Sequence, residues 1–404
     1  MQGYLDVVKI SALRIPFVAT VLGALPIGML GLGLVLYVHQ LTGSLAAGGL
    51  AAAGFGLGNA AGMAVQGRLV DRFGQAMILA CAGMTCAAWS VVVVCSVPAS
   101  GGQGFAVAAS AGLGFCIPAT TGSMRVLLAE WVRGVEARAA GYALLAVLFQ
   151  LALLSGPLLT SMLLALVGPG AAVVAGGLMA GGAGVLFSMT AASRNWRPVK
   201  DSARHDGVFK NAGLSVLLLV AAGTGISSGV IAVAVPAAAL SLGTAADSGI
   251  LIATMSAGQI VAGLLFGSRA WRWPASRTLL AALAGSAVAS GLAAWAASSL
   301  TLLFAVLFLI GLCGGPSAIA SSALLDTLVS RATLTRSYTL TVSFSLVGAA
   351  LGNAIGGAVT QNFGYWQAFA LSACGVTGVL AVGTLFRRAL GNKPEVLSVT
   401  AQKR

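Results

Sequence analysis

The residues best placed to do chemistry in this sequence form a short charged segment, residues 67–75 (GRLVDRFGQ), between two long apolar runs. Asp71 stands between two arginines, so a carboxylate is held among cations, where it can also accept hydrogen bonds from the amino end of a neighbouring helix. Gly67 and Gly74 allow the tight turn that joins two membrane-crossing segments in water. We therefore expect Asp71 and Arg72 to form an ionic latch between helices. The alternative is a positively charged turn with no other role.

A second group of polar residues lies inside the apolar runs. A buried amide or hydroxyl without a partner costs free energy, so such residues either bind a ligand or bind one another. The candidates for a binding cavity are Asn59, Thr121, Gln150, Gln259 and Asn353. Each of them could instead make a hydrogen bond between helices that holds a bundle together.

Charged residues are scarce near the apolar runs. Arg125 and Asp326 lie near the ends of two runs, and an ionisable residue at such a place is a functional candidate that could pair or contact a substrate. The alternative is that each side chain reaches out to the membrane surface. No Asp or Glu stands near the middle of any run, so the sequence predicts a cavity for neutral, zwitterionic or amphipathic organic molecules. Coupling to protons stays open.

Signatures of catalysis are missing from the sequence. It has no phosphate-binding P-loop, only 2 histidines, and 6 cysteines without the spacing of metal ligands. We expect the cysteines to be small packing residues, and we expect no enzyme activity, no metal and no cofactor.

These residues must be positioned by a bundle of membrane helices. Of the 404 residues, 58% are hydrophobic and 8% are charged, and the mean hydropathy is +0.97, values that a water-exposed surface does not tolerate. The 55 glycines suit helices that pack closely in lipid. A formal net charge of +13 could indicate nucleic acid binding, but the cations cluster between apolar runs. We expect an all-α polytopic membrane protein that binds no nucleic acid.

Twelve apolar runs are long enough to cross the hydrocarbon core, which takes about 20 residues of helix. A polar stretch divides them into two groups of six. We therefore predict an amino-terminal domain (1–192), a cytoplasmic linker (193–212), a carboxy-terminal domain (213–388) and a short tail (389–404). The expected spans are 14–38, 45–66, 76–97, 103–127, 139–166, 171–192, 213–240, 247–267, 277–298, 301–324, 338–360 and 365–386.

The basic residues set the expected orientation. All 22 lysines and arginines fall into seven clusters on one side of the twelve runs, so the positive-inside rule puts both termini in the cytoplasm. The first apolar run reaches about Val38, is longer than the core of a secretory signal, and should remain as the first membrane helix. We expect a multi-pass, monomeric protein of the bacterial inner membrane.

The charged segment resembles a known family signature. Its residues match the G-x-L-x-D-R-x-G motif found between the second and third helices of the major facilitator superfamily, at Gly67, Leu69, Asp71, Arg72 and Gly74. The resemblance implies a transporter of two six-helix domains, in which Asp71 and its arginines form an interdomain latch on the cytoplasmic side that stabilises the outward-open state. The glutamine that follows departs from the basic residue usual in the family, which weakens the expected latch.

A second resemblance favours export. Ser155-Gly156-Pro157 partly matches a glycine-proline motif that export branches of the family carry in helix five, where Gly156 and Pro157 would allow a bend. An ordinary proline kink is the alternative. Many proton-coupled exporters of the family carry an arginine where this sequence has Ala106, and its absence puts the arginine-linked proton route in doubt.

The sequence therefore predicts a secondary active transporter that moves a small organic molecule by alternating access. The expected direction is export of a drug, secondary metabolite or similar amphipathic compound, and protons are one candidate coupling ion. Within transport, the alternative is uptake or facilitated diffusion of a sugar or other neutral metabolite. From another class, the alternative is a non-transporting membrane sensor.

Overall fold

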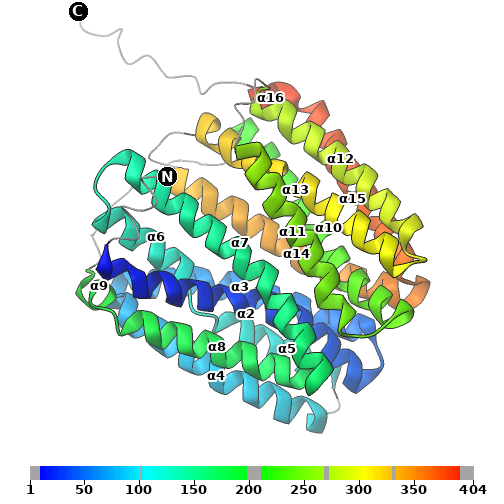
Figure 1. Ribbon diagram of the computed structural model, residues 1–404, viewed down its shortest axis with the longest axis horizontal. Coiled ribbons are helices and arrows are strands. Elements are labelled where there is room, and N and C mark those ends of the chain that lie inside the picture. The colour runs from blue at the N-terminus through cyan, green and yellow to red at the C-terminus, as the bar shows by residue number, and fades with distance from the viewer. Residues whose placement is uncertain (1–9, 101, 198–210, 268–272, 330–333, 392–404) are drawn as a thin grey trace, which may run out of the picture.

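The computed structural model describes residues 10–100, 102–197, 211–267, 273–329 and 334–391, and every regular element in this part of the chain is a helix. The amino-terminal half holds α2 (Ser11–Thr42), α3 (Leu45–Phe73), α4 (Gln75–Ser100), α5 (Gln103–Phe115), α6 (Thr120–Trp131), α7 (Val135–Leu166), α8 (Pro169–Ser188) and α9 (Ala191–Asn195). The carboxy-terminal half holds α10 (Ala212–Leu242), α11 (Asp247–Gly267), α12 (Ala275–Ala296), α13 (Leu300–Leu328), α14 (Leu334–Phe363), α15 (Tyr365–Leu385) and α16 (Arg387–Gly391). Figure 1 shows the two halves side by side.

Eleven stretches of the described chain are long and apolar enough to cross a membrane. They include Gln103–Trp131 as one run, which α5 and α6 share. Helix α3 is not among the eleven, because glycines and Asn59 dilute its hydropathy, but its 29 residues are ample for a span. With α3 added, the eleven become the twelve membrane helices that the sequence predicts. The all-α membrane fold is thereby confirmed.

The two halves repeat one packing pattern. In the first half α2 packs against α7 and α8, α3 against α5, and α4 against α8. In the second half α10 packs against α14 and α15, α11 against α13, and α12 against α15. The halves meet mainly through two helix pairs, α3 with α14 and α7 with α11 (Figure 1). We call these two contacts the seam.

The polar stretch after the sixth span begins inside the first half. Helix α9 packs against α2, α4 and α8, and Trp196 lies in a buried cluster with Leu13 and Phe187. The first residues of the predicted linker 193–212 thus lie in the amino-terminal core, because an indole ring buries a large apolar surface there. The rest of that linker, 198–210, lies outside the described residues, as do both ends of the chain.

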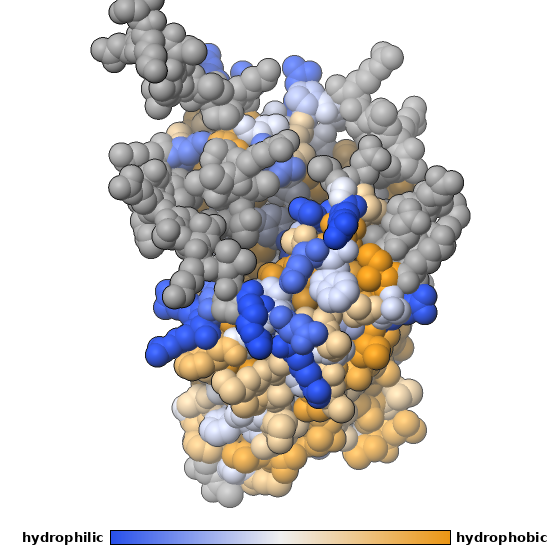
Figure 2. Space-filling view, turned by 90° about the vertical axis from the view of Figure 1, so that its left-hand side faces the viewer, coloured by the Kyte–Doolittle hydropathy of each residue, from blue (hydrophilic) through white to orange (hydrophobic). Residues whose placement is uncertain are grey.

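Basic side chains gather at one end of the bundle. The turns after α3 and α6 lie beside Arg72 and Arg133, and α16 carries Arg388. Figure 2 looks onto the side of the molecule that is at the left in Figure 1, and hydrophilic side chains cross the middle of this face above a broad apolar surface. We call this end of the bundle the basic end, and the opposite end, where α2 joins α3, the far end.

Candidate functional site

The seam is tight at the far end between α3 and α14. A Cβ on Gly49 would stand only 2.9 Å from the Cα of Gly357, and the backbone of Asn353 is closer still. Nearer the far end, the backbone N–H of Leu45 donates a hydrogen bond of 2.9 Å to Oε1 of Gln361. Glycine is required at position 49, because the two helix backbones touch there.

The second helix pair of the seam, α7 with α11, is equally tight at the far end. Gly249 lies directly on the backbone carbonyl of Pro157 and leaves no room for a Cβ. About one turn closer to the far end, the hydroxyl of Ser161 donates a hydrogen bond to the carbonyl of Ala246. Both halves are therefore joined here by backbone contacts that tolerate no larger residue.

An amide pair bridges the same two helices nearer the middle of the membrane. Nε2 of Gln150 donates a hydrogen bond of 3.0 Å to Oε1 of Gln259, across 109 residues of sequence. Both side chains are partly buried. A Cβ on Gly314 of α13 would lie 3.5 Å from Nε2 of Gln259, so the small residue there leaves space for the amide. Two of the five predicted cavity residues are thus brought into direct contact.

On the basic side of this amide pair the helices separate. No atom of a neighbouring element in the described chain lies within 4 Å of the place where a Cβ would stand on Gly263 of α11 or Gly67 of α3. Met63 and Leu69 of α3 are exposed. Among the described residues, the seam is therefore closed at the far end and open at the basic end, and Gln150 and Gln259 mark the transition.

The predicted bend in helix five lies where three helices meet. A Cβ on Gly156 would stand 3.2 Å from the Cα of Gly28 in α2. The carbonyl of Pro157 contacts Gly249 of α11. Helix α7 runs unbroken through Pro157, whose missing N–H leaves the carbonyl of Leu153 without its usual helical partner. These residues join α2, α7 and α11 at the closed end of the seam.

A break in the helical hydrogen bonding falls in the fourth predicted span. The expected span 103–127 is divided into α5 and α6, which leaves Pro118 between them. On α3, Gly54, Gly58 and Gly62 recur every four residues and so lie on one face of the helix. A backbone carbonyl of α5 lies so close to each of them that a Cβ would not fit. The next residue on that face of α3 is Gln66.

Gln66 replaces the helical hydrogen bonds that the break removes. Its Nε2 donates to the carbonyls of Phe115 (3.0 Å) and Ile117 (2.8 Å), and its Oε1 accepts from the backbone N–H of Ala119 (3.0 Å). The side chain is buried, so these backbone groups would otherwise lack partners. Sequence reasoning missed this residue, although its four-residue spacing from the glycines and the nearby Pro118 were visible signals.

At the basic end, a side-chain contact joins the two halves. The guanidinium carbon of Arg125 on α6 lies 5.0 Å above the ring centroid of Tyr338 on α14, a cation–π geometry. Asp326, in the last turn of α13, makes no ion pair with Arg125 within the described residues. Both Arg125 and Asp326 are exposed. Tyr338 was not a predicted site residue, because an aromatic residue on a membrane helix carries no functional signal by itself.

The charged segment makes the predicted turn. Gly74 ends α3 with φ at +87°, a conformation that favours glycine, and its N–H donates to the carbonyl of Val70 at 2.8 Å. Asp71 is exposed and forms no ion pair within the described ranges, whereas Arg72 lies 5.1 Å above the ring of Phe73. Within the described residues, the two side chains expected to latch the basic end thus make no ion pair with the other half.

The remaining cavity candidates lie on three other helices, α3, α6 and α14. Asn59 is 5% exposed and lies at the crossing of α3 with α5, where a Cβ on Gly114 would stand 2.9 Å from its backbone nitrogen. Asn353 lies where α14 meets α3 and α10, and its Oδ1 is buried without a hydrogen-bond partner among the described residues. Thr121 stands in the first turn of α6, directly after the break.

Beside Gln150 and Gln259, the described residues offer a ligand hydrogen bonds and packing. In the ranges that the structure describes, no group of three or more His, Cys, Asp or Glu could hold a metal ion, and the six cysteines are free thiols. The site presents a pair of amides at the inner limit of the opening between the two halves.

Comparisons with known proteins agree with this architecture. The family model described as Major Facilitator Superfamily matches residues 17–216 and again residues 217–403. Among solved structures, a mutant of the nucleoside transporter NupG superposes with a TM-score of 0.74 at 12% identity, covering 92% of this chain and 99% of that one. The peptide transporter POT, solved in complex with sulfate, superposes with a TM-score of 0.70 at 12% identity, covering 93% of this chain and 94% of that one. No match to curated protein sequences reaches significance.

Two six-helix halves that meet along a seam open at one end define a polytopic membrane carrier. The family model matches each half once, and together the matches cover nearly the whole chain. The chain belongs to the Major Facilitator Superfamily and is a membrane transporter of that type. The two similar structures, at 12% identity, establish the fold alone.

Proposed function

We propose that this protein is an alternating-access carrier for a small neutral or zwitterionic organic molecule, which binds between the two halves beside Gln150 and Gln259. The observation that carries the proposal is that the described seam is closed at one end and open at the other. Backbone contacts such as Gly249 on Pro157 close the far end, and the halves part at the basic end. A site in that position is reached from one side at a time when the halves rock.

The amide pair suits an uncharged ligand with both donors and acceptors. Each glutamine side chain has one carbonyl and two N–H donors, and the bond between Gln150 and Gln259 uses only part of that capacity. A solute that bridges the two amides would replace water there without leaving a buried charge unpaired. Nucleosides, sugars, short peptides and small aromatic amphiphiles all fit this description.

The positions of the acidic residues support a carrier without proton coupling. Five of the nine Asp and Glu residues lie in the described helices, each in a first or last turn, namely Asp71, Glu130, Glu136, Asp247 and Asp326. Proton coupling needs a titratable group that both sides reach in turn, which places it near the middle of the seam. A carrier of this kind moves its solute down the solute's own gradient, so export and uptake are the same cycle run from opposite sides.

We place the basic end in the cytoplasm of a bacterial cell, with both termini inside, because positively charged loops are retained on that side. The structure then corresponds to an inward-open carrier. This assignment agrees with the role that the signature motif implies for Asp71, since a latch that stabilises the outward-open state is released when the basic end is open. We propose that Asp71 and Arg72 engage the second half only after the basic end closes.

Counterflow in vesicles tests the proposal. The purified full-length protein is reconstituted, the vesicles are loaded with one solute class at a time, and entry of the labelled solute is measured with and without a pH gradient. We expect saturable flux for at least one uncharged class that changes less than about twofold when the gradient is imposed. Accumulation driven by the gradient would show proton coupling, and ligand binding without flux across the panel would favour the sensor.

A further inference from the structure

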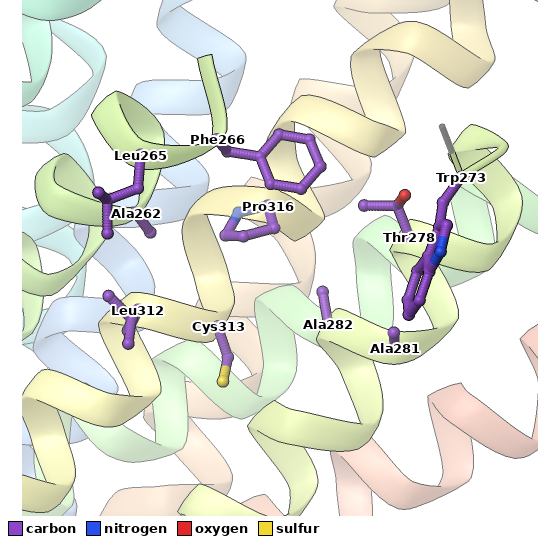
Figure 3. A pocket seen from close by; sticks show the side chains of 10 residues that line it. All are labelled: Ala262, Leu265, Phe266, Trp273, Thr278, Ala281, Ala282, Leu312, Cys313 and Pro316. Atoms are coloured by element: carbon purple, nitrogen blue, oxygen red, sulfur yellow. The ribbon is translucent and has the colours of Figure 1, made fainter. Parts of the chain in front are cut away.

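A trough opens on the carboxy-terminal half, away from the seam. Helices α11 and α12 form its walls and α13 its floor, and its volume is about 310 Å³. Figure 3 shows Phe266 and Trp273 on either side of the trough, with Leu312, Cys313 and Pro316 along its floor. The lining is almost wholly apolar.

The trough faces the lipid. Leu302, Leu309 and Pro316 recur every seven residues and therefore lie on one face of α13, and the two leucines are exposed. Gly314 packs against Gln259 on the other side of the helix, toward the seam. The floor of the trough thus continues the apolar outer surface of the bundle, which in a membrane protein is covered by acyl chains.

The trough reaches the membrane boundary at the basic end. Phe266 is the last residue of the apolar span of α11, and Thr278, which also lines the trough, stands in the first turn of α12. Trp273 is 60% exposed beside it. Tryptophan is enriched at the level of lipid headgroups, where its ring is partly apolar and its N–H is polar.

The polar end of the trough attracts an anion. Arg277 is exposed and lies four residues before Ala281, a lining residue, so both side chains stand on the same face of α12. The first turn of α12 carries no acidic residue, and Pro274 supplies no side-chain cap. The N–H groups of this first turn and the helix dipole therefore add positive potential beside the guanidinium group.

We propose that the trough binds one acyl chain of an anionic phospholipid, whose phosphate lies between Arg277 and the amino end of α12. The hydrocarbon tail matches the apolar floor, and the anionic headgroup matches the cation at its mouth. Basic sites between membrane helices on the cytoplasmic side bind such headgroups. This lipid site is separate from the solute site beside Gln150 and Gln259, and it does not depend on which solute is transported.

Native mass spectrometry of the full-length protein tests this site. The protein is delipidated in mild detergent and then exposed to phosphatidylglycerol or phosphatidylcholine with identical chains. We expect the wild type to retain phosphatidylglycerol at least fivefold better than phosphatidylcholine.

Ala281→Trp fills the trough and should lower retention of both lipids at least fivefold. Val288→Trp, seven residues further on the same face and exposed, is the matched control and should change nothing. Arg277→Glu should abolish the preference between the two lipids.

Equal retention by Ala281→Trp and Val288→Trp would overturn the trough as the binding site. Equal retention of the two lipids by the wild type would overturn the anionic headgroup. A second measurement uses no bulky substitution, so it does not depend on whether the Ala281→Trp variant folds. The fluorescence of Trp273 is the component that is lost in Trp273→Phe. Phosphatidylglycerol brominated along one chain should quench this component. An unquenched Trp273 component would also contradict the proposal.

Discussion

The two ends of the seam are joined by different kinds of contact. At the far end, backbones meet at Gly49 and Gly249, where even a methyl group would collide with the opposite helix. At the basic end, the described contact between the halves is made by the side chains of Arg125 and Tyr338. The first kind of contact depends on shape, whereas the second depends on side chains that can change rotamer.

This difference bears on how the carrier moves. Close backbone packing is lost over a fraction of an ångström, so the far end has two states, in contact or apart. Side-chain contacts at an exposed surface are weak and are exchanged without moving a helix. We infer that opening of the far end is the energetically larger step and that the basic end adjusts to it.

The largest effect is expected from Gly249→Leu, which places a branched side chain against the carbonyl of Pro157. Overpacking of about 1–3 kcal/mol would disfavour the closed far end roughly 5- to 150-fold. Transport measured by counterflow should therefore fall about fivefold or more. Gly291→Leu, on α12 away from the seam and facing open space, is the control and should retain most of the flux. Equal losses in both variants would contradict the contrast between the two ends.

The next effect concerns Gln66, which holds the break in helix four and so positions α6 at the basic end. Gln66→Leu leaves three backbone groups without partners and should destabilise the protein by about 1–3 kcal/mol, measured by thermal unfolding in detergent. Gln75 is also buried, but its amide has no hydrogen-bond partner in the part of the chain that the structure describes, so Gln75→Leu should be neutral or stabilising. The same melting temperature for both variants would mean that Gln66 does not support the break.

A smaller effect is expected at Gln150 and Gln259, between the closed and the open part of the seam. Gln150→Ala and Gln259→Ala should each raise the KM of the transported solute, because each removes a hydrogen-bonding group from the site. A double-mutant cycle on KM should give a coupling energy of about 0.5–1.5 kcal/mol, the usual net value of one hydrogen bond. Strictly additive effects would show that the two amides act independently.

The smallest effect is expected at Tyr338. Tyr338→Leu removes the ring beneath Arg125 and should alter the turnover rate about two- to fivefold, since an exposed cation–π contact contributes about 0.5–1 kcal/mol. Tyr338→Phe keeps the ring and should behave as the wild type. If the leucine and phenylalanine variants had the same turnover rate, the ring would have no part in joining the halves.

The sequence predicted the spans and the basic end correctly because both depend on properties that are local in the chain. Hydropathy over about 20 residues determines whether a helix can cross the hydrocarbon core. The turn at Gly74 was equally local, since a positive φ needs glycine. The place of the break was not local. The fourth span was predicted as one helix, and the break beside Pro118 depends on Gln66 from another helix.

Composition, hydropathy and the spacing of the cations thus determined a membrane bundle of two six-helix halves with one basic end, because water and lipid act on each segment separately. The tertiary structure alone decided that Gln150 meets Gln259, that Arg125 lies over Tyr338, and that Trp196 belongs to the amino-terminal core. Those contacts depend on which helix faces lie opposite each other, and close packing of small residues determines that only when all the helices are in place.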